Sequence, residues 1–375
     1  MEPAYLDPRT GETFPLGEPR WCGTGRAPLL LTPLAGIGRD RIDTAERSLW
    51  RYRAALPFEI DDPITLGEGG TPLLDRTLHG ARARLKCDFL MPTGSFKDRG
   101  ASVMLSLLRA QGVRRVLEDS SGNGGAAIAA YAAAGGLAAT VLAPEATSAA
   151  KTVQMRAYGA TVELVPGTRQ DTAEAALRRA EQTFYASHNW HPFFLQGTKT
   201  LAYELWEDLG FRAPDNVIVP CGAGSNVLGC EIGFAELQRA GEIETLPRIF
   251  AAQPANCAPI AASFLSGTDQ AVETEIRPTI AEGTAIAQPI RLIEVLGALK
   301  ETRGGAVMLA ESEIVQATLD LAAIGLYVEP TCAQVAAAFG KLLDSGAISA
   351  DQTTVLVLTG SGLKAMPLVA AMLAP

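Results

Sequence analysis

A repeated alternation of short apolar segments with longer helical patterns, between residues 84 and 358, most constrains the fold. Such alternation predicts parallel sheets with helices on both faces. Continuous apolar runs such as Thr354–Leu358 suit strands that are buried on both faces. Ligands in such sheets bind beyond the carboxyl ends of the strands. We expect strands at Arg84–Phe89, Arg115–Glu118, Thr140–Ala143, Thr161–Val165, Val217–Val219, Ile249–Gln253, Ala306–Leu309 and Thr354–Leu358.

The composition describes an enzyme-like chain with few charges. Its 375 residues are enough for two or three domains and a large core. Hydrophobic residues make up 47% and charged residues 19%, which fits a soluble α/β enzyme. The net charge of −9 argues against nucleic acid or an anionic membrane as a partner. No apolar run reaches the roughly 20 residues that span a bilayer, and no signal peptide is visible, so we expect a cytoplasmic protein.

The cysteines and the N-terminal region add little chemistry. The cysteines form no Cys-x-x-Cys pair, so we expect no metal site, no disulfide framework and a reducing cytoplasm. The leader is irregular, with Leu29–Thr32 expected as a strand and Ala45–Leu56 as a helix. The six cysteines are Cys22, Cys87, Cys221, Cys230, Cys257 and Cys332.

One lysine stands between a predicted tight turn and a predicted helix in Pro92–Gly100, which reads Pro-Thr-Gly-Ser-Phe-Lys-Asp-Arg-Gly. Ser95 is a candidate N-cap of that helix. Lys97 lies beside backbone N–H groups and Arg99, in a positive field that favours the neutral amine. A neutral amine condenses with an aldehyde, so Lys97 is a candidate nucleophile. Taken alone, the same pattern also describes a solvated surface lysine.

Three polar loops follow predicted strands. Ser120–Gly125 has small side chains and precedes a helix expected at Ala126–Ala134, so its backbone N–H groups can hold a carboxylate. Cys221–Asn226 has the composition of a phosphate cradle, but it lacks the P-loop lysine and the dinucleotide glycine spacing. Thr359–Gly362 offers a hydroxyl that can pair with a ring nitrogen. Each loop by itself also fits an ordinary turn between a strand and a helix.

An amine nucleophile, a phosphate cradle, a carboxylate-binding turn and a neutral hydroxyl together describe a pyridoxal phosphate site. The segments that carry them resemble the fold-type II pyridoxal phosphate-dependent enzymes (the tryptophan synthase β superfamily), and among these most of all the threonine synthases. The resemblance covers nearly all of residues 60–375, and the match of Pro92–Gly100 is highly specific. It also includes Gly67–Leu74, Gly197–Thr200 and Ala281–Gly283.

The resemblance implies an α/β fold of two domains, each with a mostly parallel twisted sheet flanked by helices. Residues 1–65 are expected to be a leader packed on the large domain. Residues 66–111 and 200–375 are expected to form the large cofactor-binding domain, and residues 112–199 a small mobile domain. A homodimer is also implied.

The resemblance assigns roles to individual residues. Lys97 would bind the cofactor as a Schiff base and move the substrate's α-proton, and Phe96 would be among the cofactor-binding residues. Asn123 would contact the cofactor's phenolic oxygen, and Thr359 would meet its pyridine nitrogen. The cofactor's phosphate would be held by Gly222, Ala223, Gly224, Ser225 and Asn226. The substrate would be bound by Ser120, Ser121, Gly122, Gly124 and Phe194.

This chain departs from the threonine synthase pattern at positions that would contact the substrate. Threonine synthases often have threonine at the position of Gly124. They tend to place asparagine and arginine before the Gly-x-Lys-Thr segment to bind the substrate's phosphate, and this chain has Phe194 at the arginine position. An aromatic ring cannot neutralise a phosphate dianion.

The missing arginine raises the question of which group replaces it. Lys151 and Arg156 can in principle substitute. We hypothesise that O-phosphohomoserine is a weaker substrate here than in typical threonine synthases. The pocket near Trp190, Phe193 and Phe194 would then favour a less charged or more apolar side chain.

The expected activity is a pyridoxal phosphate-dependent elimination or replacement on an amino acid, led by the threonine synthase reaction. A threonine or serine dehydratase, or a related ammonia-lyase or β-replacement enzyme on a non-phosphorylated amino acid, is the alternative. A non-catalytic binder of an amino acid or of the cofactor is an alternative of another class, and the intact Lys97 counts against it. The expected partners are an amino-acid substrate and a second copy of the chain.

Overall fold

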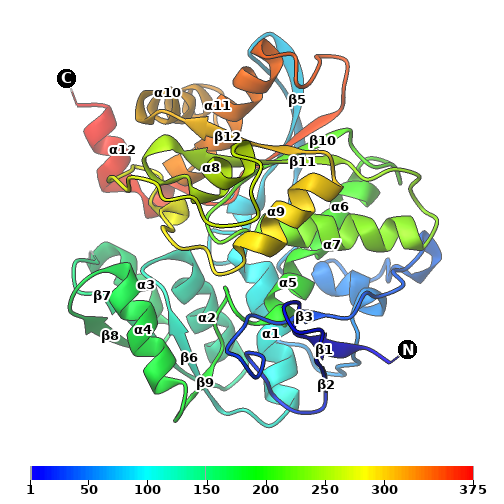
Figure 1. Cartoon of the computed structure of the whole chain (residues 1–375), viewed down its shortest axis with the longest axis vertical. Helices are drawn as coiled ribbons and strands as arrows, with labels where there is room; N and C mark the ends of the chain where they lie inside the picture. Colours follow the sequence, from blue (N-terminus) through cyan, green and yellow to red (C-terminus); the bar gives the residue numbers. More distant parts are fainter. Residues whose placement is uncertain (1, 148, 375) are drawn as a thin grey trace. The chain divides into compact units, whose positions relative to one another are not determined.

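The computed structural model of the chain describes residues 2–147 and 149–374, without the side chains of residues 149–151. It divides into two compact units (Figure 1). The first unit is Met1–Gly69 with Lys97–Thr198, and the second is Gly70–Phe96 with Lys199–Pro375. These bounds place residues 97–111 in the same unit as residues 112–198, whereas the sequence analysis grouped residues 97–111 with the large domain. The division into functional domains stays a prediction.

The first unit is built on a parallel sheet with the strand order β8-β7-β6-β9. Val141 packs with residues of one helix, α2, while its neighbour Leu142 packs with another, α4. Because neighbouring side chains of a strand point to opposite faces, α2 and α4 cover the two faces of this sheet. The strands are β6 (Arg115–Asp119), β7 (Ala138–Pro144), β8 (Thr161–Val165) and β9 (Phe184–Tyr185), and the helices between them are α2 (Asn123–Ala134), α3 (Ala149–Ala157) and α4 (Arg169–Arg179).

Two further helices of this unit, α1 (Lys97–Ala110) and α5 (Pro192–Thr198), pack closely on each other. A Cβ on Gly197 would lie 2.0 Å from the carbonyl oxygen of Arg99, and a Cβ on Gly100 would lie 2.5 Å from the ring of Phe194. Only glycine permits such close contact between the two helices. The sequence pattern did not predict α5, whose seven residues are all buried.

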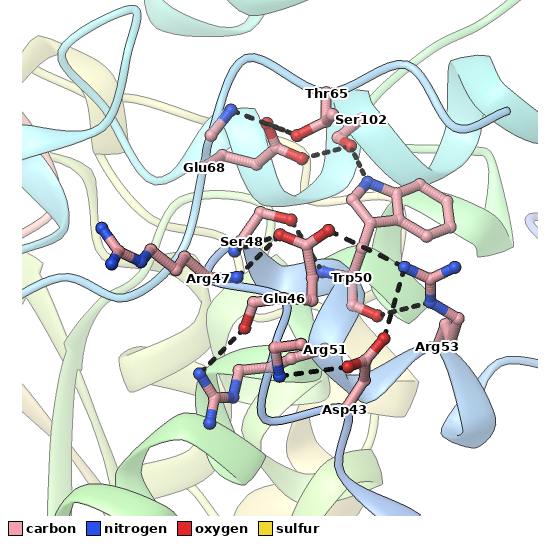
Figure 2. Close-up of polar contacts among 12 residues, drawn as sticks. Asp43, Glu46, Arg47, Ser48, Trp50, Arg51, Arg53, Thr65, Glu68 and Ser102 are labelled. Carbon is pink, nitrogen blue, oxygen red and sulfur yellow. Dashed lines mark hydrogen bonds and ion pairs between the residues drawn. The ribbon is translucent and has the colours of Figure 1, made fainter.

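The leader is held to α1 by a buried polar network, part of which is drawn in Figure 2. Trp50 Nε1 donates to Ser102 Oγ at 2.9 Å, and this hydroxyl donates to Glu68 Oε1 at 2.5 Å. The hydroxyl of Tyr131 donates to the second oxygen of Glu68 at 2.8 Å. The helix predicted at Ala45–Leu56 is present but shorter, as a 3₁₀ helix at Leu49–Ala55.

Short strands complete the leader. β1 (Ala4–Leu6) pairs antiparallel with both β2 (Thr13–Pro15) and β3 (Leu30–Leu31), and β3 lies within the strand predicted at Leu29–Thr32. No helix in the described part of the chain has the length and apolar character needed to cross a membrane.

The second unit is built on a six-stranded sheet with the order β12-β11-β10-β13-β5-β4, parallel except for the β4–β5 pair. The predicted fold class, α/β with mostly parallel sheets flanked by helices, is confirmed in both units. The strands are β4 (Leu73–Leu78), β5 (Ala81–Lys86), β10 (Asn216–Pro220), β11 (Arg248–Pro254), β12 (Gly305–Leu309) and β13 (Thr354–Val357). The helices are α6 (Thr200–Asp208), α7 (Ser225–Arg239), α8 (Pro259–Leu265), α9 (Leu292–Glu301), α10 (Glu311–Ala323), α11 (Pro330–Asp344) and α12 (Met366–Met372).

The network around Glu68 gives a stability prediction. Ser102→Ala removes the acceptor of Trp50 and a donor to a buried carboxylate, so we expect a loss of about 1–3 kcal/mol in the free energy of unfolding. Chemical denaturation measures this loss. Ser266→Ala, which removes the hydroxyl of an exposed serine after α8, is the control and should change stability by less than about 0.5 kcal/mol. Equal stability of the two variants would show that the network contributes nothing.

Candidate active site

Three of the predicted site segments lie at one edge of the second unit's sheet. β13 is paired in parallel with β10 on one side and with β5 on the other. Thr359 follows β13, the loop Cys221–Gly224 follows β10, and the turn Pro92–Phe96 comes shortly after β5. Because carboxyl ends of parallel strands meet at one edge, the parallel pairing brings these segments together.

Direct hydrogen bonds join the lysine turn to the loop after β13. The N–H of Phe96 donates to the carbonyl of Thr359 at 3.0 Å, and the N–H of Ser361 donates to the carbonyl of Gly94 at 3.0 Å. The predicted N-cap role of Ser95 is wrong, because its buried hydroxyl has no hydrogen-bond partner among residues 2–147 and 149–374. Lys97, the next residue after Phe96, is the first residue of α1 as expected.

The predicted phosphate cradle, Gly222–Asn226, has the backbone geometry of an anion site at the start of α7. Gly224 is the N-cap in the left-handed region (φ +93°), and a Cβ there would lie 2.2 Å from Cγ2 of Val295. Ser225 begins the helix and is buried, so its backbone N–H lies at the positive end of the helix dipole. The buried side chain of Asn226 has neither its oxygen nor its nitrogen paired within the part of the chain that the structure describes.

Neighbouring residues hold this loop in place. Gln253 Nε2 donates to the carbonyl of Cys221 at 2.9 Å, which fixes the start of the loop. A Cβ on Gly222 would lie 3.1 Å from the carbonyl oxygen of Gly283, so that segment also lies against the loop. Ala223 is partly exposed. The narrow backbone, the helix dipole and the unpaired amide of Asn226 fit a phosphate group, and the residues present therefore fit a phosphorylated cofactor.

In the first unit, the serine-rich turn follows β6 and runs into α2. Gly122 is the N-cap of this helix, and Asn123 and Gly124 are its first residues. The helix therefore begins three residues before the predicted start, Ala126. Ser120 is buried, and its hydroxyl accepts from the N–H of Gly122 at 3.3 Å. Ser121 is partly exposed in the same turn. A turn at a helix N-terminus suits a carboxylate ligand.

Phe194, the residue in the expected arginine position, lies beside Lys97. The amine of Lys97 is 5.5 Å from the centre of the Phe194 ring, and Phe194 is fully buried. The other two aromatic residues of the predicted pocket pack elsewhere in the unit. Phe193 makes edge contacts with Tyr5 and Phe58, among other rings of the core, and Trp190 makes an edge contact with Trp21.

A buried histidine that the sequence did not assign to the site completes this region. The ring of His188 makes an edge contact with Phe194, with centroids 5.8 Å apart. A Cβ on Gly124 would lie 2.8 Å from both Cε1 and Nδ1 of His188. His188 Nδ1 is also 2.5 Å from Glu118 Oε1 at the end of β6, and Glu118 is fully buried. The structure thus brings Lys97, Phe194, His188 and Gly124 together within one unit.

The surroundings of His188 and Glu118 shift the pKa values of both side chains. Burial raises the pKa of Glu118 well above its ordinary value, and the charge of Asp119 raises it further. Burial lowers the pKa of His188, and the positive charges of Lys97 and Arg169 lower it further. Both directions favour a state in which the carboxyl group holds a proton and the imidazole is neutral. Two features of the sequence could have indicated this pair. Glu118 is a charged residue at the end of an apolar strand, and His188 is one of only three histidines in the chain.

Of the two cations suggested by the sequence, the structure describes only the side chain of Arg156. Arg156 is exposed and donates to the carbonyl of Val162 at 3.3 Å. The side chain of Lys151 lies outside the described residues. Arg169, at the start of α4, is instead the arginine whose charge acts on Glu118, Asp119 and His188.

The fold and these segments define a pyridoxal phosphate-dependent enzyme of the α/β class, and comparison with known proteins agrees. The family model described as "Pyridoxal-phosphate dependent enzyme" matches residues 64–360. The chain is 33% identical over 337 residues to a threonine synthase from Methanosarcina acetivorans, covering 88% of this chain and 83% of the relative. It is 35% identical over the same length to that of Methanocaldococcus jannaschii, with the same coverage.

Solved structures show the same fold. A threonine deaminase from T.th. superposes with a TM-score of 0.66 at 27% identity, covering 78% of this chain and 92% of that one. A fungal L-serine ammonia-lyase from Rhizomucor miehei superposes with a TM-score of 0.71 at 21% identity, covering 80% of this chain and 96% of that one.

The chain belongs to the pyridoxal phosphate-dependent enzyme family and, within it, to the threonine synthase family.

The phosphate cradle gives a cofactor prediction. Gly224→Ala forces a side chain into the left-handed region and against Val295, so we expect pyridoxal phosphate to bind the apoprotein roughly tenfold or more weakly. Absorbance titration measures the affinity. Gly241→Ala is the matched control, since Gly241 has φ +76° and no heavy atom within 4 Å of an added Cβ. If both variants bind the cofactor as the parent does, the loop is not the phosphate site.

Proposed function

We propose that the chain catalyses the threonine synthase reaction, which converts O-phosphohomoserine and water to threonine and phosphate. The observation that carries the proposal is the 33–35% identity to threonine synthases over 88% of the chain. The anchored turn before Lys97 and the cradle at Gly222–Asn226 support it, because they provide the amine and the phosphate site that such an enzyme needs.

Each segment of the site has a separate role in the proposed reaction. When bound, pyridoxal phosphate supplies the electron sink that stabilises negative charge next to the substrate's α-carbon. Lys97 attaches the cofactor and moves the proton at that carbon. The loop Gly222–Asn226 binds the cofactor's phosphate, and Asn123 orients its phenolic oxygen. The turn Ser120–Gly124 binds the substrate's carboxylate through its N–H groups.

The neutral hydroxyl of Thr359 is proposed to meet the pyridine nitrogen. Thr359 is buried directly after β13, and the turn before Lys97 is tied to its carbonyl. A neutral hydroxyl at this position would not hold a proton on the pyridine nitrogen, which would suit elimination of a leaving group.

Assembly and location are also proposals. A homodimer is supported by the resemblance to the family. A reducing cytoplasm is supported by the six cysteines, all of which are free thiols and five of which are buried.

The function is tested by incubating the purified holoenzyme with O-phosphohomoserine, serine and threonine, and measuring threonine, phosphate and keto acid. We expect threonine and phosphate in equal amounts, with a lower kcat/KM than in threonine synthases that have the arginine. Lys97→Ala should fold but lose turnover by about 10³-fold or more. Keto acid from serine or threonine, without threonine from O-phosphohomoserine, would instead identify a dehydratase.

A further inference from the structure

We propose that His188, backed by Glu118, donates the proton that the departing phosphate of the substrate needs. This proposal rests on the threonine synthase reaction proposed above and names the residue that handles its leaving group. It assigns Phe194 and Gly124 the role of making room for the imidazole ring.

The position of His188 supports this role. Its ring lies against Gly124, in the turn proposed to bind the substrate's carboxylate, and against Phe194, whose ring lies beside the amine of Lys97. Nδ1 is bonded to Glu118, so Nε2 is the ring nitrogen available for a ligand. Cε1, the atom between the two nitrogens, would lie 2.8 Å from a Cβ on Gly124. The imidazole thus stands next to the carboxylate-binding turn, and it contacts the Phe194 ring that lies beside the catalytic lysine.

The packing around His188 also explains why the two departures from the threonine synthase pattern, Gly124 and Phe194, occur together. A threonine at position 124 would place its Cβ 2.8 Å from the imidazole, which is closer than real contacts allow. Glycine at this position is therefore required by the ring of His188. An aromatic ring at position 194 contacts the same imidazole from another side. The histidine, the glycine and the phenylalanine form one packed group, and the only group among them that can bind an anion is the imidazole.

The protonation of the pair determines what Nε2 can do. The backbone N–H of His188 donates to Glu118 Oε2 at 3.1 Å, so both oxygens of this carboxyl group contact His188. With two protons shared among Oε1, Nδ1 and Nε2, one lies between Glu118 and Nδ1 and the other is on Nε2. Whichever atom holds the inner proton, Nε2 is then a donor.

Within residues 2–147 and 152–374, four charged or titratable groups act on the pair. Asp119 lies next to Glu118 on β6 and accepts a hydrogen bond from Tyr185 of β9. Lys97 of α1 and Arg169 of α4 contribute positive charge. The positive charge of Arg169 favours the binding of an anionic leaving group beside His188.

The proton transfer balances. Cleavage of the carbon–oxygen bond of a phosphate ester dianion would release the trianion of phosphate. This trianion is too basic to leave without a proton at neutral pH. In the proposed step, that bond breaks and its electrons remain on the oxygen, which takes the proton from Nε2. Nδ1 takes the proton from Oε1 of Glu118. Hydrogen phosphate leaves, and the pair is left as a carboxylate and a neutral imidazole protonated on Nδ1. The electrons that expel the phosphate come from the C–H bond at the β-carbon, next to the carbon that carries the ester oxygen, and the proton of that bond passes to the amine of Lys97.

The test compares variants over a range of pH. The donor is present while the pair holds two protons and is lost as the pH rises through the pKa at which it releases one. In the parent enzyme, kcat/KM for O-phosphohomoserine should therefore fall on the alkaline side. His188→Asn should lower kcat by about 10²–10⁴-fold and remove that alkaline limb. Glu118→Gln keeps an N–H donor to Nδ1, but an amide cannot pass a proton to Nδ1 as Nε2 gives its own away, so kcat should fall while KM stays within about threefold.

A binding measurement provides a readout that does not depend on turnover. The probe is 2-amino-5-phosphonopentanoate, in which a methylene replaces the ester oxygen so that phosphate cannot leave. Calorimetric titration of the holoenzyme should show about tenfold weaker binding in His188→Asn than in the parent. His191→Asn is the matched control, since His191 is also buried but packs against Tyr5 and Phe193.

The outcomes separate this proposal from the proposed function. A parent enzyme that makes no threonine from O-phosphohomoserine overturns the function, and the role of His188 with it. A parent enzyme that makes threonine, together with a His188→Asn variant of unchanged rate, pH profile and phosphonate affinity, overturns the role of His188 alone. Equal losses in His188→Asn and His191→Asn would show a structural effect only.

Discussion

The parallel pairing of β13 with both β10 and β5 is the constraint on which the cofactor-binding side of the site depends. It sets the ends of three strands at one edge, so that three loops of different sequence, following three different strands, share one place. Hydrogen bonds from Phe96 to Thr359 and from Ser361 to Gly94 then fix the lysine turn to the loop after β13. The backbone, more than any side chain, therefore positions the residue before Lys97.

A second constraint governs the side of the site that meets the substrate's side chain. The imidazole of His188 fills the space above Gly124 and contacts Phe194, so none of these positions can change independently. Where an arginine would supply a permanent charge, this chain has a buried carboxyl–imidazole pair without net charge in its favoured state. Such a pair can donate a proton but cannot neutralise a dianion by itself, which accounts for expecting both activity toward O-phosphohomoserine and a lower efficiency.

The α/β class and most strands could be predicted, because continuous apolar runs and alternation are local signals. Features decided by distant contacts could not. Residues 192–198 contain proline and glycine and do not read as a helix, yet they form α5 by packing on α1. Leu49–Ala55 forms a 3₁₀ helix, with the N–H of Leu49 bonded to the carbonyl of Glu68. The contact of His188 with Glu118 joins residues 70 positions apart and leaves no periodic trace in the sequence.

The central claim is that Lys97 is the residue that binds pyridoxal phosphate, and borohydride reduction of the holoenzyme followed by peptide mapping tests it most directly. Two other lysines of the described chain are buried but held by carboxylates, Lys86 by Glu204 and Asp208 at 2.6 Å each and Lys199 by Glu236 at 2.7 Å. These contacts engage both amines in ion pairs, so neither is free to attack an aldehyde. The account predicts that the reduced cofactor is found only on the peptide containing Lys97. Cofactor on Lys86 or Lys199, or no covalent attachment, would contradict it.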